Sequence, residues 1–299
     1  MPLRRRLLFA AAAAAVTSLL FPLRAATPPA TADASALRVV SFNVRNSNAP
    51  DGENAWPKRA DFFFDTVAGF DADLLGFQEV LAVQHDAIVA RLTGHGFVGG
   101  ARDDGKRKGE WCLIAYRKTR FTAVTHGDFW LSETPEVPGS KSWDAALTRI
   151  CSWVRLRDHA TGRELVYANT HFDHKGVVAR QEAARVISTR LSALARGVPA
   201  ILTGDLNINE DNPAYRVFVR PDTPGAIRWI DAYRAVHPVR RPDESSFNGF
   251  KPVVDGSRID FIFHTADFTA TAATIDRTSR DGRFPSDHFP VTAVLVWRK

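Results

Sequence analysis

Polar side chains able to bind metal ions or move protons recur where short apolar runs of the sequence end. Asn43 follows one such run, Glu79 a second, and Asp205 with Asn207 a third. Carboxylate and amide oxygens are the ligands that Mg²⁺ prefers, and a carboxylate can also orient a water molecule for attack. The acids and histidines placed in the same way are His171, Asp173, Asp260, Asp287 and His288. Together these residue types suit hydrolysis of a phosphate ester, which needs a cation, a base and groups that stabilise phosphoryl charge.

Each of these residues alone has an ordinary structural explanation. An Asp at a strand end is usually a turn or cap residue, and a single His is often structural. Asn43 would satisfy a backbone turn equally well, and Asp260 would neutralise the neighbouring Arg258. The chemical interpretation therefore depends on the whole set rather than on one member.

The apolar runs that carry these residues alternate between strand and helix patterns. Strands are predicted at 37–44, 73–77, 111–116, 121–129, 149–156, 164–170, 199–202, 259–263 and 291–297. Helices are predicted at 56–70, 80–92 and 177–195, with a short one at 229–236 inside a long loop, 220–257. Strand–helix–strand units at both ends and a strand meander between them indicate an α/β (α+β) protein with mixed sheets. In such layered folds ligands bind where strands end, so we expect the polar residues to meet there.

The N-terminus is typical of an export signal. Arg4, Arg5 and Arg6 precede an apolar run at 7–16, and Ala-Thr-Ala at 30–32 ends the segment. The paired arginines also resemble a twin-arginine signal. We expect a signal peptide at 1–32, a flexible leader at 33–36 and one catalytic domain at 37–299, located in the periplasm or secreted. An uncleaved N-terminal anchor is the alternative; after cleavage no stable membrane span is expected.

Composition and charge exclude several classes of protein. With 45% hydrophobic and 24% charged residues, the chain is not collagen-like, coiled-coil or largely disordered. Its 39 basic residues exceed its 33 acidic ones, but four arginines would leave with the signal and no acid would. The mature chain is then close to neutral, whereas a protein that binds duplex nucleic acid usually has a strong basic surplus. We therefore expect duplex nucleic acid to be a less favoured partner.

The chain has two cysteines, too few for a disulfide scaffold, and no Cys/His cluster of the kind that binds zinc. Cys112 and Cys151 both fall in predicted strands. They form a disulfide if those strands are neighbours, or remain two buried thiols.

Six short motifs resemble those of the endonuclease/exonuclease/phosphatase superfamily, in the order usual for that family. They are Ser-Phe-Asn43, Gln78-Glu79-Val80, Thr170-His171-Phe172-Asp173, Gly204-Asp205-Leu206-Asn207, Arg258-Ile259-Asp260 and Ser286-Asp287-His288-Phe289-Pro290-Val291. The resemblance runs from residue 37 to 297. It implies the DNase-like fold, a four-layer sandwich of two packed mixed β-sheets flanked by helices.

The resemblance also implies a metal site. Glu79 corresponds to the principal ligand, Asn43 lies beside it, and Asp287 completes the site or instead orients His288. The implied cofactor is Mg²⁺, with Mn²⁺ or Ca²⁺ as alternatives.

The implied catalytic residues lie in the later motifs. Asp205 resembles the general base that positions the attacking water, and Asn207 orients that water or a phosphoryl oxygen. His288 resembles the histidine that contacts the scissile phosphate. His171 contacts the phosphate on the leaving side, and Asp260 resembles the carboxylate that orients His171.

Candidate substrate contacts come from segments similar to a secreted bacterial branch of the family, at 129–135, 142–144 and Arg149, and from the residues after His171. They are Trp143, Asp144, Arg149, Asp173 and Arg180. Trp143 would stack on a sugar or base, or pack under its own loop. Arg180 would bind a phosphate with its planar fork, or pair with Glu182.

The sequence thus predicts an exported metal-dependent phosphoesterase, a phosphodiesterase or phosphatase acting on a small ester such as a sugar phosphate or lipid head group. A secreted DNase-like endonuclease or exonuclease is the first alternative. A sphingomyelinase-like phospholipase is the second, and would need an exposed aromatic hairpin near 129–131. A binding module for phosphorylated glycans is the non-enzymatic alternative. No protein partner is indicated.

Overall fold

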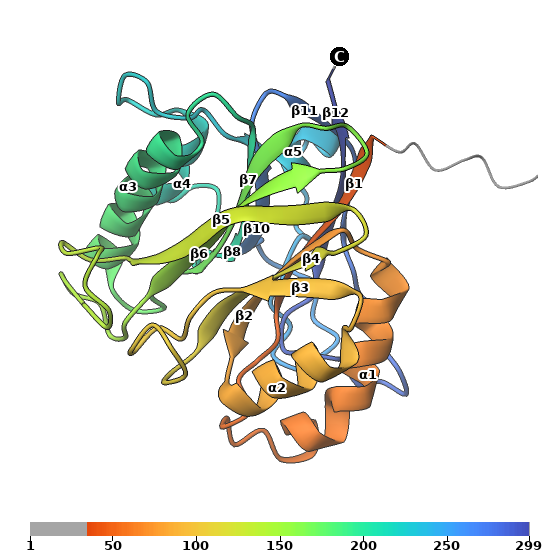
Figure 1. Cartoon of the computed structure of the whole chain (residues 1–299). Helices are drawn as coiled ribbons and strands as arrows, with labels where there is room; N and C mark the ends of the chain where they lie inside the picture. The colour runs from red at the N-terminus through yellow and green to blue at the C-terminus, as the bar shows by residue number, and fades with distance from the viewer. Residues whose placement is uncertain (1–34, 299) are drawn as a thin grey trace, which may run out of the picture. The chain divides into compact units, whose positions relative to one another are not determined.

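The computed structural model describes residues 35–298, and two six-stranded β-sheets form its centre (Figure 1). The predicted signal peptide lies outside the described residues, so its cleavage site stays a prediction. No helix of the described part is long and apolar enough to span a membrane.

The first sheet has the strand order β11-β12-β1-β2-β4-β3. Its strands are β1 (Ala36–Asn43), β2 (Leu74–Val80), β3 (His95–Val98), β4 (Trp111–Arg117), β11 (Phe268–Ile275) and β12 (Val291–Trp297). Strands β1 and β2 are parallel, whereas the other neighbours are antiparallel. The sheet is therefore mixed.

The second sheet has the order β5-β6-β7-β8-β10-β9. Its strands are β5 (Phe121–Trp130), β6 (Ile150–Asp158), β7 (Glu164–His171), β8 (Ala200–Asp205), β9 (Ile230–Asp231) and β10 (Asp260–His264). Here β7 and β8 form the parallel pair. Each sheet thus contains one strand–helix–strand unit.

Helices cover the outer faces of both sheets. Helices α1 (Trp56–Phe70) and α2 (Ala82–Arg91) pack on the first sheet, and α3 (Val177–Leu194) and α4 (Pro213–Val219) pack on the second (Figure 1). Helix α1 forms because its apolar residues repeat at helical spacing and bury Phe63, Phe64 and Val67 against the sheet. Helix α5 (Ala232–Val236) is short and contacts β10 and β11. The predicted four-layer sandwich of mixed sheets is confirmed.

The parallel pairs bring the functional strand ends together. Asn43, at the end of β1, lies opposite Gln78 of β2, and His171, at the end of β7, lies opposite Asp205 of β8. Strand β10 runs antiparallel to β8, so its first residue, Asp260, also lies opposite Asp205. The backbone pairing alone therefore places three strand ends of the second sheet at one edge.

The two sheets approach closely beneath this edge at Gly76 of β2. A Cβ at Gly76 would lie 2.1 Å from Thr203 Oγ1 and 2.6 Å from Asn169 Oδ1. Gln78 donates from Nε2 to Asn169 Oδ1 at 2.7 Å, which links the sheets by a buried hydrogen bond. Glycine is thus required here for space rather than for backbone freedom.

Several elements differ from the sequence-based expectations. Strand β3, helix α4, strand β11 and a 3₁₀ turn at Gly52–Asn54 were not predicted, and the long loop at 220–257 also contains β9. Cys112 and Cys151 are both free and buried, and they lie in different sheets, so the alternative of two separate thiols describes the structure. The exposed aromatic hairpin is wrong, because Phe129, Trp130 and Leu131 are all buried.

Candidate active site

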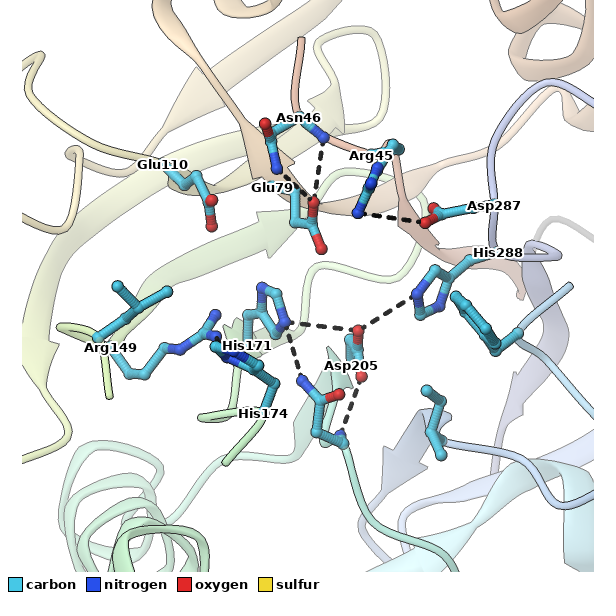
Figure 2. A pocket seen from close by; sticks show the side chains of 14 residues that line it. Arg45, Asn46, Glu79, Glu110, Arg149, His171, His174, Asp205, Asp287 and His288 are labelled. Atoms are coloured by element: carbon cyan, nitrogen blue, oxygen red, sulfur yellow. Dashed lines mark hydrogen bonds and ion pairs between the residues drawn. The ribbon is translucent and has the colours of Figure 1, made fainter. Parts of the chain in front are cut away.

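A cavity of about 480 Å³ opens where these strand ends meet (Figure 2). Most of the residues that line it are charged or polar. It is lined by Arg45, Asn46, Glu79, Glu110, Leu147, Arg149, His171, His174, Asp205, Asn207, Phe247, Ile259, Asp287 and His288. Six of the eight residues predicted for metal binding or catalysis are among them, and only Asn43 and Asp260 of the eight are not.

Glu79 reaches the cavity through a bulge in β2. The pairing with β4 shifts between Phe77 and Val80, and Glu79 has a left-handed backbone with φ of +62°. Its Oε1 accepts a hydrogen bond from Asn43, and its Oε2 accepts two from the backbone and side-chain amides of Asn46, all at 3.0 Å. Burial opposes ionisation, but the hydrogen bond from Asn43 and other favourable interactions hold the pKa of Glu79 below its usual value. Glu79 is therefore a fixed, ionised carboxylate.

Asn43 connects the predicted metal ligand to the predicted base. Its Nδ2 donates to Glu79 Oε1 and to Asp205 Oδ2, each at 3.0 Å, and it is fully buried. Its Oδ1 accepts from the backbone N–H of Arg45 at 2.9 Å. Asn43 thus lies behind the cavity wall and holds two carboxylates of different sheets in register.

Asp205 lies at the centre of the polar network. Its Oδ1 accepts from the backbone N–H of Asn207 at 2.9 Å, and its Oδ2 lies 3.5 Å from His171 Nε2 and 3.7 Å from His288 Nε2 (Figure 2). Burial and the nearby charge of Asp260 raise the pKa of Asp205 to about 7. A carboxylate with such a pKa exchanges protons readily near neutral pH.

His288 is oriented by Asp260, not by Asp287. The Nδ1 of His288 lies 2.9 Å from Asp260 Oδ2, so Nδ1 carries a proton and Nε2 turns toward Asp205. Burial alone would lower the pKa of His288, but the charges of Asp260 and Asp205 raise it well above its usual value. The expectation that Asp260 orients His171 is therefore wrong, because Asp260 is bound to the other histidine.

His171 is held by Asn207 instead. The Nδ2 of Asn207 lies 3.0 Å from His171 Nε2 and donates to the backbone carbonyl of Phe172 at 3.1 Å. Because this amide nitrogen donates, Nε2 of His171 accepts and its Nδ1 carries the proton. Burial and the charge of Arg149 hold the pKa of His171 well below its usual value. The two histidines of the site thus differ in charge.

Arg45 is a cavity residue that sequence reasoning missed. It follows Asn43 by two positions, has a left-handed backbone with φ of +56°, and forms a two-pronged ion pair with Asp51. Its Nη1 also lies 3.5 Å from Asp287 Oδ2. Its place two residues after the first motif was the available signal.

The donor set fits a divalent cation. Glu79 and Asp287 are oxygen donors that line one cavity, and burial together with the negative charge of Glu79 raises the pKa of Asp287. Such a like-charged pair is relieved by a bound cation. Asp205, Asp260 and His288 also place possible ligand atoms within 4.8 Å of one another.

Of the five predicted substrate contacts, Arg149 alone lines the cavity. Asp144 accepts hydrogen bonds from the backbone of Val178 and Ala179, so it caps α3. Asp173 accepts three backbone N–H bonds, from Leu147, Lys175 and Gly176. These two acids therefore have structural roles.

Arg180 and Trp143 also lie outside the cavity wall. Arg180 donates to the backbone carbonyl of Asp173 at 3.0 Å, and the predicted pairing with Glu182 is wrong, because Glu182 binds Arg185. Trp143 is half-buried and has a left-handed backbone with φ of +54°. The stacking platform expected at Trp143 is thus not part of this cavity.

Three further polar cavity residues, Asn46, His174 and Glu110, were also missed. Asn46 holds Glu79, and His174 adjoins Asp173 in the sequence. Phe247, in a stretch that the sequence left as either substrate-facing or a turn, lines the cavity and packs edge-on against His288 with ring centroids 5.1 Å apart. Glu110, which pairs with Arg102, stands in no motif. Proximity to a motif marked Asn46 and His174, whereas nothing in the sequence marked Glu110.

Comparison with known proteins agrees with this architecture. The sequence profile of the Endonuclease/Exonuclease/phosphatase family matches residues 40–288. A solved protein of that family from Bacteroides thetaiotaomicron is 38% identical, with a TM-score of 0.79 over 88% of this chain and 98% of that one. A mannosyl-6-phosphatase of Bacteroides thetaiotaomicron is 39% identical, with a TM-score of 0.79 over 87% of this chain and all of that one.

A curated relative is more distant. The uncharacterized protein R895 of Acanthamoeba polyphaga mimivirus is 23% identical over an alignment of 223 positions, which covers 62% of this chain. The aligned region spans about a third (32%) of that relative's length.

Proposed function

We propose that this chain, which belongs to the endonuclease/exonuclease/phosphatase family, is an exported metal-dependent phosphoesterase that hydrolyses a small phosphate ester such as a sugar phosphate. Members of the family are hydrolases that act on phosphoesters. The observation that carries the proposal is the bridge from Glu79 through Asn43 to Asp205, which joins a cation-binding carboxylate to a base on one cavity.

The cation site comprises Glu79 and Asp287, with Asn43 behind them. When bound there, Mg²⁺, or Mn²⁺ or Ca²⁺ in its place, would stabilise the negative charge on the phosphoryl oxygens. Asn43 and Asn46 prepare the site, because their hydrogen bonds keep Glu79 ionised and in one orientation.

Asp205 acts as the general base. The backbone N–H of Asn207 holds its Oδ1, which leaves Oδ2 on the side of the two histidines. A water molecule beside Oδ2 loses its proton to Asp205 as its oxygen attacks phosphorus. The P–O bond to the alcohol breaks with its electron pair going to the alcohol oxygen, which takes a proton from water, so no covalent enzyme intermediate forms. A pKa near 7 suits this proton transfer at neutral pH.

His288 stabilises the charge that develops on the phosphoryl oxygens. Asp260 holds its ring in the protonated form with Nε2 on the Asp205 side, and from there Nε2 donates to a phosphoryl oxygen. Asn207 and His171 form the opposite side of the same site. Charge stabilisation and proton removal are thus performed by neighbouring groups.

The cavity and the relatives both support a small substrate. A volume of about 480 Å³ is in the usual range for small-molecule sites. Leu147, Phe247 and Ile259 supply apolar wall for the alcohol part of an ester. The similarity to a mannosyl-6-phosphatase favours a sugar phosphate over the other esters.

A substrate panel with matched variants tests the function. Sugar phosphates, a phosphodiester, phospholipid vesicles and plasmid DNA are each incubated with Mg²⁺, and we expect turnover of a sugar phosphate that a chelator abolishes. Glu79→Gln and Asp205→Asn should each lower kcat/KM by about 10³-fold or more, while Glu182→Gln on α3 should leave it unchanged. Plasmid nicking without sugar phosphate turnover would favour a nuclease, and absence of all turnover would favour a binding module.

Export is tested separately. The full chain produced in a bacterium should appear in the periplasm or medium in a shortened form. Substituting Arg4 and Arg5 by Lys should retain it in the cytoplasm if the signal is of the twin-arginine type. Recovery of the full-length chain in the membrane fraction would support the N-terminal anchor instead.

A further inference from the structure

Arg149 is a buried cation whose hydrogen-bond donors are only partly used by the described residues. Its side chain is 5% exposed and lines the cavity, yet its Nε and Nη1 have no hydrogen-bond partner among the described residues. The nearest acid is Asp173, whose Oδ2 lies 3.7 Å from Nε and already accepts a backbone N–H from Leu147. A buried guanidinium with unused donors is costly unless an anion meets it.

His174 is an exposed neighbour that contacts the buried Arg149. The Nη2 of Arg149 lies 3.3 Å from His174 Nδ1. Because a guanidinium only donates, Nδ1 of His174 accepts, and the ring proton lies on Nε2. His174 is exposed and lines the cavity, so its Nε2–H is an accessible donor. Arg149 therefore fixes the ring form in which His174 can bind an anion.

The pair lies across the site from His288. Figure 2 shows Arg149 and His174 on one side of His171 and Asp205, and His288 with Asp287 on the other. Asp205 Oδ2 lies 3.5 Å from His171 Nε2 and 3.7 Å from His288 Nε2, so Asp205 contacts both histidines. A phosphate held beside Asp205 therefore has donors on two opposite sides.

We propose that Arg149 and His174 form a subsite for the non-ester oxygens of a phosphomonoester, and that this subsite selects monoesters over diesters. A monoester offers three such oxygens and up to two charges, whereas a diester offers two oxygens and one charge. The second alcohol group of a diester would replace one of the charged oxygens that accept from the buried Arg149, so the donors of Arg149 would be left without a partner. The leaving alcohol lies instead toward the apolar wall of Leu147, Phe247 and Ile259.

This inference rests on the proposed function for its substrate, but its first test does not need turnover. Binding of inorganic phosphate is measured by calorimetry in wild type, Arg149→Gln, His174→Ala and a control, Arg180→Gln. Arg180 contacts the same Asp173 segment but does not line the cavity. We expect phosphate affinity to fall about tenfold or more in Arg149→Gln, about threefold to tenfold in His174→Ala, and not in the control. Equal affinity in wild type and Arg149→Gln would overturn the subsite.

The second test measures selectivity. Hydrolysis of para-nitrophenyl phosphate and of bis-para-nitrophenyl phosphate is compared in the same proteins. We expect wild type to prefer the monoester, and Arg149→Gln to lower kcat/KM about 50-fold or more for the monoester but fivefold or less for the diester. An equal fall for both esters would contradict selection by Arg149.

Two variants distinguish loss of the subsite from misfolding. His174→Ala changes an exposed side chain, so its fold should persist even if Arg149→Gln is unstable. Arg149→Lys keeps the charge but loses the planar fork, and should retain part of the phosphate affinity. If wild type hydrolyses neither ester but phosphate binding depends on Arg149, the proposed activity fails while the subsite stands.

Discussion

Asp260 and His288 form a buried pair in which Asp260 Oδ2 lies 2.9 Å from His288 Nδ1. The other carboxylate oxygen, Oδ1, has no partner within residues 35–298. Asp260 begins β10, whereas His288 precedes β12 of the other sheet. The pair therefore joins the two sheets at the site and fixes which nitrogen of His288 faces Asp205.

Asp260→Asn should lower kcat/KM about 10²-fold while the protein remains folded, because the ring of His288 loses its orientation and its protonated form. His288→Ala should have a larger effect. If Asp260 acts through His288, the double variant should be no slower than His288→Ala alone. Steady-state kinetics of the three variants checks this, and additive losses would show that the two residues act independently.

Cation binding should be visible without substrate. Glu79 and Asp287 repel each other in a buried site, so a bound cation stabilises the folded state. At ten times its Kd, Mg²⁺ should add about 1.4 kcal/mol and raise the unfolding temperature by about 3–6 °C. Glu79→Gln should lose most of this shift in a thermal melt, and Glu182→Gln should keep it. A full shift in Glu79→Gln would place the cation elsewhere.

The sequence predicted the strands well where they were buried on both faces or where apolar and polar residues alternated clearly along them. Strand β11 was missed because Thr and Ala dominate Phe268–Ile275, and half of its residues face solvent at the edge of the sheet. Helix α4 was missed because it has seven residues, too few for a periodic pattern. Its signals were local, namely Asn212 as the N-cap and Pro213 in the first turn.

The site was predictable where function and strand ends coincide, as at Asn43, Glu79 and Asp205. The hydrogen-bond partners of its two histidines were not predictable. Asp260 and Asn207 lie at adjacent strand ends, and which histidine each one binds depends on the direction of its side chain. Asp144 was misassigned because a cap residue and a ligand have the same residue type. Glu110 carries no local signal at all, because its place in the cavity follows from the packing of β4.

Asp173 should make the fold sensitive to acid. Burial opposes its ionisation, but backbone N–H bonds to both oxygens hold its pKa well below the usual value. A carboxylate with a lowered folded-state pKa stabilises the protein above its unfolded pKa of about 3.9, and this stabilisation is lost as pH falls toward the folded value.

Asp173→Asn should therefore destabilise the protein by about 1–3 kcal/mol at pH 7, and the difference from wild type should shrink at pH 3. Urea unfolding at the two pH values measures this. Asp222→Asn, in an exposed loop, serves as the control. A difference that is the same at both pH values would show that the charge of Asp173 is not responsible.

Gly76 and Gly69 offer a matched pair that tests the close approach of the sheets. An Ala at Gly76 would collide with Thr203 and Asn169, whose side chains are fixed by buried hydrogen bonds to each other and, through Thr203, to Tyr167. Gly76→Ala should lower the free energy of unfolding by about 1–3 kcal/mol or more. It should also lower kcat/KM, because β2 carries Glu79 only three residues further on.

The control is Gly69, which lies in α1 with no heavy atom within 4 Å of an added Cβ, so Gly69→Ala should raise stability by up to about 1 kcal/mol. Denaturant unfolding of both variants decides the matter, since equal stabilities would mean that the sheets do not meet at Gly76 as closely as described.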